Sequence, residues 1–272
     1  MTRARARTRT RTLPAAGAGV AALLALSACS SSDDSAAATP DSSASDQLSG
    51  TVTVFAAASL KESFTTLGET FEKAHPGTKV TFSFGGSDSL AASITGGAPA
   101  DVFASASPKT MKIVTDAGDA AGTPVTFVRN QLEIATLPGN PDGIASLEDL
   151  TDSGLKVVLC AEEVPCGAAA RTALDAGGLE LTPVSYEQDV KAALTKVELK
   201  EADAAVVYKT DVHAAGDKVE GVDFPESAEA VNDYPIARLK DARNSAGADA
   251  FIDLVRSDEG QKVLAEAGFL TS

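Results

Sequence analysis

The chain has 272 residues, with 44% hydrophobic and 22% charged side chains, three cysteines, no tryptophan and a net charge of −15. Its length favours two domains of modest size, and its composition excludes a wholly disordered or fibrous protein. Residues 1–28 contain five arginines and no acid, so their removal leaves 18 basic and 38 acidic side chains, a net charge of −20. Nucleic acid and anionic lipid surfaces are therefore disfavoured as partners, since their phosphates would be repelled.

Residues 1–28 have the layout of a secretory signal peptide, with a basic arm, an apolar run over 13–26 and a small-residue end. The apolar run is shorter than the about 20 residues that a membrane span needs. The end of this segment, Leu26-Ser27-Ala28-Cys29, resembles the lipobox of bacterial lipoproteins, in which the cysteine is lipidated. Residues 29–50 are poor in apolar side chains and are predicted to form a flexible linker. We therefore expect an exported protein, lipid-anchored to the outer face of the cell membrane; the alternative is an ordinary signal peptide with an incidental cysteine.

From residue 51 the chain alternates short strands with amphipathic helices. In chain order, the pattern predicts a strand over 51–55, a helix over 60–74, a strand over 80–84, a helix from 87, a strand over 100–104 and a helix from 108. Strands over 131–137 and 155–159, helices from about 167 and from 187, strands over 203–208 and near 235–239, and helices over 248–255 and from 258 to Gly268 follow. This alternation predicts an α/β fold with a largely parallel sheet and helices on both faces.

Small residues occur at the junctions between predicted strands and the helices that follow them. Ser59 and Ser87 follow the first two strands, and Cys166 and Val190 lie near later helix starts, with no Arg, Lys or His side chain apparent at these junctions. Each helix N-terminus presents unpaired N–H groups and a charge of roughly +0.5, so three of them would supply about +1.5 to a bound anion. Tyr208, at the end of an apolar strand, could add its hydroxyl.

Structural explanations exist for the same residues. Serine is a common N-cap, and Ser59 with Glu62 matches an S-x-x-E capping box, while Tyr208 could be an ordinary boundary tyrosine. A serine hydrolase would need a base, but neither histidine lies in a recognisable motif. The same two histidines, in unrelated segments, disfavour a zinc site. Because the protein is exported, Cys160 and Cys166 are expected to form a short-loop disulfide; two free buried thiols are the alternative.

Several segments together resemble the molybdate-binding proteins of bacterial ABC importers, over about residues 50–272. The segments that carry the resemblance are 54–60 (VFAAASL), 84–87 (FGGS), 97–103 (GAPADVF), 164–167 (VPCG), 189–194 (DVKAAL), 206–208 (VVY) and 260–269. Two departures are Cys166, where the family commonly has alanine after the proline, and Asp88, which adds a negative charge beside Ser87.

The resemblance implies a two-lobed periplasmic-binding-protein fold (type II), with each lobe a mixed, mainly parallel sheet flanked by helices. Lobe 1 would comprise 51–129 and 233–272, and lobe 2 would comprise 130–232, with the ligand in the cleft between them. It also implies hydroxyl and backbone N–H donors from Ser59 and Ser87, backbone N–H donors from Cys166 and Val190, and the phenolic hydroxyl of Tyr208.

The function that this implies is capture of molybdate and tungstate and their delivery to an ABC importer permease. The protein would be a monomer with no cofactor, no catalytic residue and no bare metal cation, since molybdenum would arrive as its oxyanion. A pocket of donors alone would reject a protonated phosphate, which needs an acceptor. The rival hypotheses are the same fold binding another oxyanion such as sulfate, a surface hydrolase using Ser59 or Ser87, and a lipoprotein scaffold with no small ligand.

Overall fold

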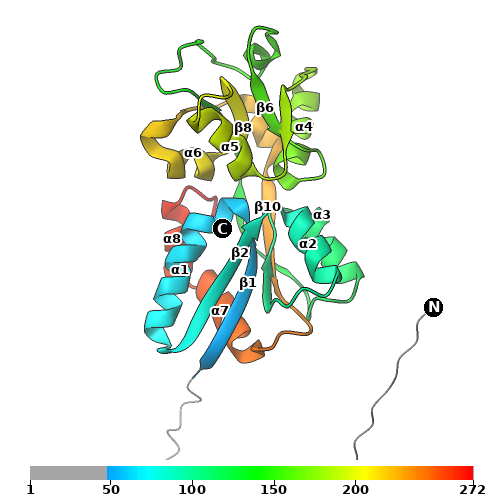
Figure 1. Ribbon diagram of the computed structural model, residues 1–272, viewed down its shortest axis with the longest axis vertical. Coiled ribbons are helices and arrows are strands. Elements are labelled where there is room, and N and C mark those ends of the chain that lie inside the picture. The colour runs from blue at the N-terminus through cyan, green and yellow to red at the C-terminus, as the bar shows by residue number, and fades with distance from the viewer. Residues whose placement is uncertain (1–47, 272) are drawn as a thin grey trace, which may run out of the picture. The chain divides into compact units, whose positions relative to one another are not determined.

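The computed structural model describes residues 48–271, so the predicted signal peptide, Cys29 and the linker up to residue 47 lie outside the described range. Two five-stranded sheets, each flanked by helices, form two lobes that the chain joins by crossing between them twice (Figure 1). We use lobe 1 for residues 48–130 and 232–271, and lobe 2 for residues 131–231. Within residues 48–271, no helix combines the length and the apolar character that crossing a bilayer requires.

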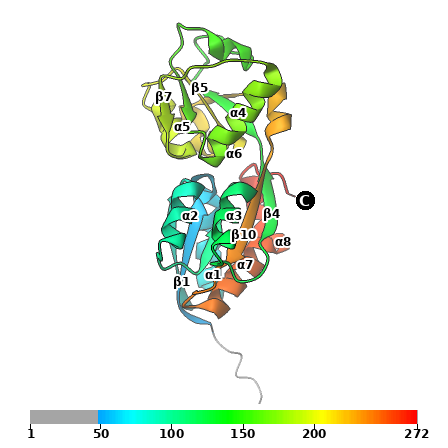
Figure 2. The same cartoon turned by 90° about the vertical axis from the view of Figure 1, so that its right-hand side faces the viewer.

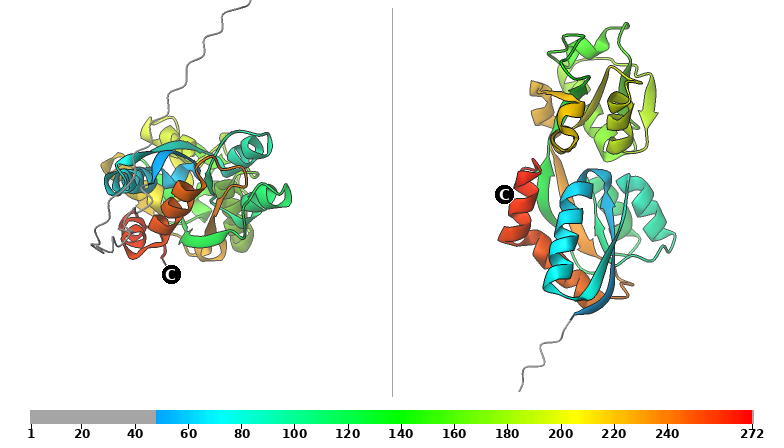
Figure 3. Two further views of the ribbon diagram at one scale, coloured as in Figure 1. Left: turned by 90° about the horizontal axis from the view of Figure 1, so that it is seen from below. Right: turned by 60° about the vertical axis from the view of Figure 1, so that its left-hand side comes forward.

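The sheet of lobe 1 has the strand order β2-β1-β3-β10-β4. Its strands are β1 (Ser49–Ala57), β2 (Gly77–Gly85), β3 (Val102–Ala104), β4 (Val125–Asn130) and β10 (Asn232–Arg238). Helices α1 (Lys61–Ala74), α7 (Ser245–Arg256) and α8 (Asp258–Glu266) cover one face, and α2 (Ser87–Thr95) and α3 (Pro108–Asp116) cover the other (Figures 2 and 3).

The alternation along β1 explains this two-sided cover. Val52, Val54 and Ala56 point to one face and join the apolar core with α1 and α7, whereas Phe55 points to the other face and packs with α2 and α3. Successive strand residues point to opposite faces of a sheet, so a strand covered on both faces needs apolar residues in both registers.

The sheet of lobe 2 has the order β7-β6-β8-β5-β9. Its strands are β5 (Leu132–Thr136), β6 (Val157–Cys160), β7 (Ser185–Glu187), β8 (Ala204–Tyr208) and β9 (Glu220–Val222). Its helices are α4 (Pro165–Gly177), α5 (Val190–Glu198) and α6 (Lys209–Ala215), with short 3₁₀ turns at η2 (Glu148–Thr151), η3 (Gly216–Lys218) and η4 (Pro225–Ala230).

Both sheets are mixed, as predicted, but parallel pairing does not predominate in either. Each sheet has two parallel and two antiparallel strand pairs. The antiparallel pairs arise from β10 and β5, the strands by which the chain enters lobe 1 and lobe 2 from the other lobe (Figure 2). Such a strand starts at the cleft and runs away from it, whereas the strands that precede helices run toward it.

Some predicted boundaries and motifs need correction. The Ser59–Glu62 capping box is wrong, because a 3₁₀ turn, η1 (Ala58–Leu60), precedes α1 and places the N-cap at Leu60 without a side-chain hydrogen bond. β1 begins at Ser49, inside the predicted linker, since β2 extends the parallel pairing back to Gly77. The strands β4, β7 and β9 were not predicted: all three are sheet edges, where one side is exposed and the apolar pattern is weak.

Candidate functional site

All five predicted ligand donors line one small cavity between the lobes. From lobe 1 it is lined by residues of the β1–η1 and β2–α2 junctions, and from lobe 2 by the N-termini of α4 and α5 and by the end of β8. The lining residues are Ala57, Ala58, Ser59, Gly85, Gly86, Ser87, Ala106, Val164, Pro165, Cys166, Asp189, Val190 and Tyr208. The empty space between its lining atoms is about 200 Å³, part of it open to solvent.

The N-terminus of α2 presents Ser87 to this cavity. Ser87 is the first helical residue after the N-cap Gly86, no side chain caps the helix, and the first N–H groups therefore keep no carbonyl partner. The Ser87 hydroxyl oxygen accepts the backbone N–H of Ala106 at 3.0 Å. Since the oxygen is already an acceptor, the hydroxyl proton is available to a ligand.

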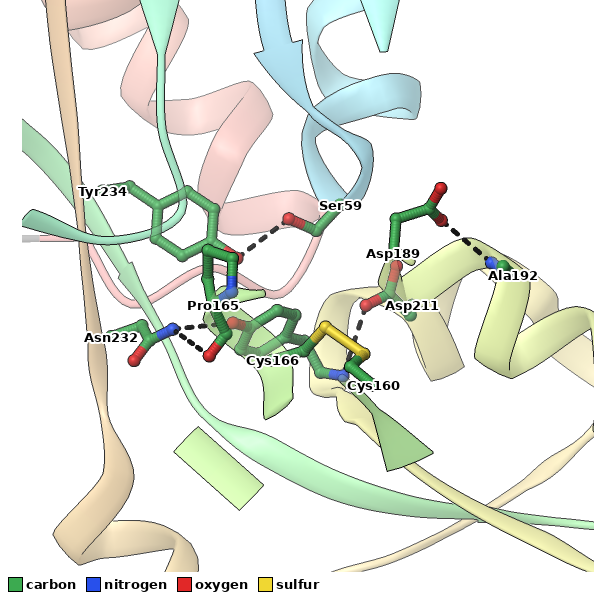
Figure 4. The surroundings of a disulfide bond; sticks show 10 residues. Ser59, Cys160, Pro165, Cys166, Asp189, Ala192, Asp211, Asn232 and Tyr234 are labelled. Atoms are coloured by element: carbon green, nitrogen blue, oxygen red, sulfur yellow. Dashed lines mark hydrogen bonds between the residues drawn. A yellow bond between two sulfur atoms is a disulfide. The ribbon is translucent and has the colours of Figure 1, made fainter. Parts of the chain in front are cut away.

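Ser59 lies in η1 and its hydroxyl is held from behind by a buried tyrosine. Ser59 Oγ lies 2.8 Å from the hydroxyl of Tyr234 on β10 (Figure 4). Asn130 Nδ2, at the end of β4, donates to that same Tyr234 oxygen at 3.3 Å and to Thr210 Oγ1 at 2.8 Å. Either hydroxyl of the Ser59–Tyr234 pair can be the donor, and when Tyr234 donates, the Ser59 proton is free to face the cavity.

In lobe 2, the N-terminus of α4 contributes backbone N–H groups. Pro165 is the first helical residue and has no N–H, so Cys166 and Gly167 carry the leading donors, with no side-chain cap. Gly167 has no room for a side chain, because a Cβ there would lie 1.9 Å from the carbonyl oxygen of Ala161. A disulfide joins Cys166 to Cys160 at the end of β6, with the two Cα atoms 5.8 Å apart (Figure 4). The strand thus holds the helix start in place.

The N-terminus of α5 supplies Val190. The N-cap Asp189 accepts the N–H of Ala192 at 2.9 Å, which satisfies the third donor of the helix and leaves those of Val190 and Lys191 unpaired by the helix (Figure 4). The sequence reading found no basic side chain at this junction and overlooked Lys191. That lysine is absent from the residues lining the cavity and pairs instead with Glu62 and Asp211.

Tyr208 presents its hydroxyl from the end of β8. The oxygen accepts Asn232 Nδ2 at 2.7 Å, so the phenolic proton can point into the cavity. Burial raises the pKa of Tyr208 well above its usual value, and the nearby Tyr234 and Asp211 add to this shift. The same burial raises the pKa of Tyr234. Both phenols therefore stay protonated over the whole physiological range and serve as donors.

Taken together, the lining offers many hydrogen-bond donors and very little to accept a proton. Ser87 and Tyr208 each accept a protein N–H on their oxygen, which leaves their protons available to a ligand, and the Ser59 hydroxyl is hydrogen-bonded to that of Tyr234. Among the described residues that line it, none is Lys, Arg or His, and the single carboxylate, Asp189, is occupied as a helix cap. The three helix ends of α2, α4 and α5 and the three hydroxyls can therefore bind an anion whose oxygens all accept.

Sequence reasoning missed Tyr234, Asn130 and Asn232, which orient the donors from behind. All three lie on β4 or β10, beside the places where the chain crosses between lobes. Asn130 ends β4 and Asn232 begins β10, and an amide side chain at the end of a strand is only a weak signal of such a role. Nothing in the sequence shows that the partner of Tyr234 is Ser59, since 175 positions separate them.

Known proteins resemble this chain in both sequence and fold. Residues 52–270 match the family described as bacterial extracellular solute-binding protein. The chain is 46% identical over 218 residues to the molybdate-binding protein ModA of Mycobacterium tuberculosis, covering 80% of this chain and 84% of the relative. Its fold matches the periplasmic molybdate-binding protein of Azotobacter vinelandii, with a TM-score of 0.71, 21% identity and coverage of 81% and 99%. It also matches the sulfate-binding protein SubI of M. tuberculosis, with a TM-score of 0.69, 18% identity and coverage of 81% and 86%.

These matches overturn two of the rival hypotheses. A surface hydrolase and a scaffold with no small ligand both disagree with a family whose members bind solutes outside the cytoplasm. Ser59 and Ser87 line a binding cavity, with no histidine among the residues around it in the described range. The chain belongs to the bacterial extracellular solute-binding proteins, a family of binding proteins and not of enzymes.

Proposed function

We propose that this protein captures molybdate and tungstate and delivers them to the permease of an ABC importer. The observation that carries the proposal is the donor-only cavity, in which Ser59, Ser87, Cys166, Val190 and Tyr208 would bind the oxyanion. The 46% identity to a molybdate-binding protein supports the choice of ion. Molybdate enters as the ligand, and all of its oxygens can accept at neutral pH.

Phosphate is disfavoured because it keeps a proton near neutral pH. That proton would need an acceptor, and an unpaired polar group in a closed site costs about 1–3 kcal/mol. Sulfate is the serious alternative, because it carries the same charge as molybdate and because a sulfate-binding protein shares this fold. Sulfate is smaller, so in a cavity shaped for molybdate its hydrogen bonds would be stretched.

The proposal is tested by isothermal titration calorimetry of the ligand-free protein. Molybdate, tungstate, sulfate and phosphate are titrated separately in the same buffer. We expect similar responses to molybdate and tungstate, a much weaker response to sulfate and none to phosphate. Equal affinity for sulfate would overturn the selectivity, and no response to any of the four would overturn the function. Molybdate and tungstate are too similar in size for the site to separate them.

Three further features belong to the proposal. Lipidation at Cys29 would hold the protein at the outer face of the membrane, since each buried methylene of an acyl chain adds about 0.8 kcal/mol. Membrane fractionation of wild type and Cys29→Ser tests this, and release of only the variant is the expected result.

The Cys160–Cys166 disulfide is tested by alkylation and mass measurement with and without reductant, where two extra adducts after reduction are expected. The protein would act as a monomer, which light scattering with and without molybdate measures.

A further inference from the structure

Outside the cavity, one ion pair joins the two lobes. Lys191 Nζ lies 3.0 Å from Glu62 Oε2 in lobe 1 and 3.1 Å from Asp211 Oδ1 in lobe 2. Every other ion pair within residues 48–271 joins residues of a single lobe. The side-chain hydrogen bonds between lobes, donated by Asn130 and Asn232, lie at the chain crossings. Lys191 therefore bridges the cleft where the chain does not.

Both members of this bridge lie directly beside the ligand cavity. Lys191 follows Val190 in the first turn of α5, and Glu62 lies three residues after Ser59 in the first turn of α1. Close by, a side chain at Gly86 of lobe 1 would lie 2.5 Å from the carbonyl oxygen of Gln188 in lobe 2. The Lys191–Glu62 pair can form only while the lobes are this close around the cavity.

The position of Lys191 is unfavourable unless carboxylates compensate for it. A cation in the first turn of a helix opposes the positive end of the helix dipole. Burial acts to lower the pKa of Lys191, but Asp211 and Glu62 outweigh it, and the net shift is upward. Separation of the lobes would remove Glu62 from this arrangement and leave Lys191 with Asp211 alone.

Asp211 connects the same lysine to a ligand donor. Its side chain is fully buried, and its Oδ2 accepts the backbone N–H of Tyr208 at 3.2 Å. Lys191 and Glu62 line a groove next to the cavity, and other charged residues line it too. Of these, Glu198 pairs with Lys218 and Asp189 caps α5. Lys61 lies on lobe 1, as Glu62 does, and would repel Lys191. Glu62 is thus the carboxylate from lobe 1 that holds Lys191.

We propose that Lys191 and Glu62 form an electrostatic latch that holds the lobes closed around the bound anion and sets its rate of release. The inference rests on the proposed function, since a latch needs a ligand to retain. Both are positioning residues: they stand outside the cavity and act by keeping its two halves together. The latch predicts an effect on dissociation, because the pair is absent before the lobes meet.

The test compares wild type with Glu62→Gln, which removes the charge from a side chain that is 49% exposed and leaves Asp211 paired. Asp116→Asn is the matched control, since it removes an exposed carboxylate from the Lys112 ion pair inside lobe 1. Binding and release of molybdate are followed by stopped flow through tyrosine fluorescence, because the chain has no tryptophan and Tyr208 lines the cavity.

We expect Glu62→Gln to release molybdate about two to five times faster than wild type, the effect of losing a half-exposed ion pair. Its association rate and its thermal midpoint without ligand should stay unchanged, and Asp116→Asn should behave as wild type. Raising the salt concentration from about 0.01 M to about 1 M should speed release from wild type and have less effect on Glu62→Gln.

Two results would overturn the latch while leaving the function intact: molybdate release from Glu62→Gln at the wild-type rate, or equal acceleration in Asp116→Asn. Failure of wild type to bind molybdate at all would instead contradict the proposed function. Lys191→Met is a weaker first choice, because it leaves Asp211 buried without its cation and can fail to fold for that reason.

Discussion

The two halves of the proposed ligand site are built from different chemical groups. Lobe 1 presents two serine hydroxyls, each held by a hydrogen bond from behind, at the starts of η1 and α2. Lobe 2 presents the N-termini of α4 and α5, where the donors are backbone N–H groups, and adds one phenol. The lobe 1 half thus depends on side-chain identity, and the lobe 2 half depends mainly on where two helices begin.

This difference determines how each half can be disrupted. A hydroxyl is removed by replacing the residue, whereas a backbone donor remains whatever the side chain is. Cys166 illustrates the point, since its side chain takes part in a disulfide while its N–H faces the cavity from the first turn of α4. Substitutions in lobe 2 should act by moving a helix end, and those in lobe 1 by deleting a donor.

The largest effect is expected from Gly167→Ala in lobe 2. The added Cβ would meet the carbonyl oxygen of Ala161 at 1.9 Å and that of Cys160 at 2.6 Å, so the start of α4 must shift. We expect a loss of about 1–3 kcal/mol of stability and a roughly 100-fold loss of molybdate affinity, measured by urea unfolding and calorimetry. Gly177→Ala in the same helix is the control, since its Cβ would meet side chains alone, those of Leu179 at 3.1 Å and Glu226 at 3.5 Å. Near-wild-type binding by Gly167→Ala would show that the α4 N-terminus contributes little.

The next effect is a dependence of stability on pH, caused by the buried carboxyl of Asp211 in lobe 2. Burial raises the pKa of Asp211 from 3.8 to about 6, although Lys191 opposes the shift. The folded protein therefore holds this proton more tightly than the unfolded chain, and the associated stability is full below about pH 4 and is lost as the pH rises through about 6.

Asp211→Asn keeps an acceptor for the Tyr208 N–H and has no proton to lose. Relative to this variant, wild type should lose on the order of 3 kcal/mol of stability between about pH 4 and 7. Urea unfolding across that range measures the difference. Parallel pH profiles for the two proteins would show that Asp211 does not titrate as described.

Deletion of the lobe 1 hydroxyls should come next. Ser59→Ala and Ser87→Ala should each weaken molybdate binding by about 1.5–3 kcal/mol, the usual contribution of a hydrogen bond to a charged group. Calorimetry measures the loss, and Ser63→Ala, which loses only a bond to the Leu60 carbonyl, serves as control. Wild-type affinity in both variants would place the anion elsewhere and remove the contrast between the lobes.

The smallest effect is expected when the orienting group alone is removed. Tyr234→Phe leaves Ser59 in place but deletes the hydroxyl that lies 2.8 Å from it. We expect a loss of about 0.5–1.5 kcal/mol in molybdate binding, the contribution of a single neutral hydrogen bond. The double variant with Ser59→Ala should bind no worse than Ser59→Ala alone. Additive losses would mean that Tyr234 acts by another route than orienting Ser59.

Much of the architecture could be predicted from local patterns. The strand–turn–helix order around Ser87 follows from the apolar alternation before Gly85 and the small residues after it, and Pro108 begins α3 as expected. Gly268, with φ +93°, closes the last helix as predicted, because a left-handed residue there suits glycine. These features are set by residues close together in the sequence, and a local sequence pattern can therefore predict them.

What could not be predicted depends on residues brought together from a distance. The capping box at Ser59 is wrong because the 3₁₀ turn η1 moves the start of α1 past it, and the Ser59 hydroxyl is instead hydrogen-bonded to Tyr234, far along the chain. The antiparallel character of β10 and β5 follows from the two crossings between lobes, which no local period records. Lys191 was overlooked. A lysine in the first turn of a helix opposes the helix dipole, so its presence indicates that carboxylates lie near.

The direction of β1 has a practical consequence for any use of this protein on a surface. The strand starts at Ser49 and runs toward the cleft, so its first residue lies at the end of lobe 1 remote from the cavity (Figure 1). Attachment through the preceding chain would leave the cleft mouth and lobe 2 unobstructed. A sensor immobilised in this way should therefore keep its cavity accessible to the ligand.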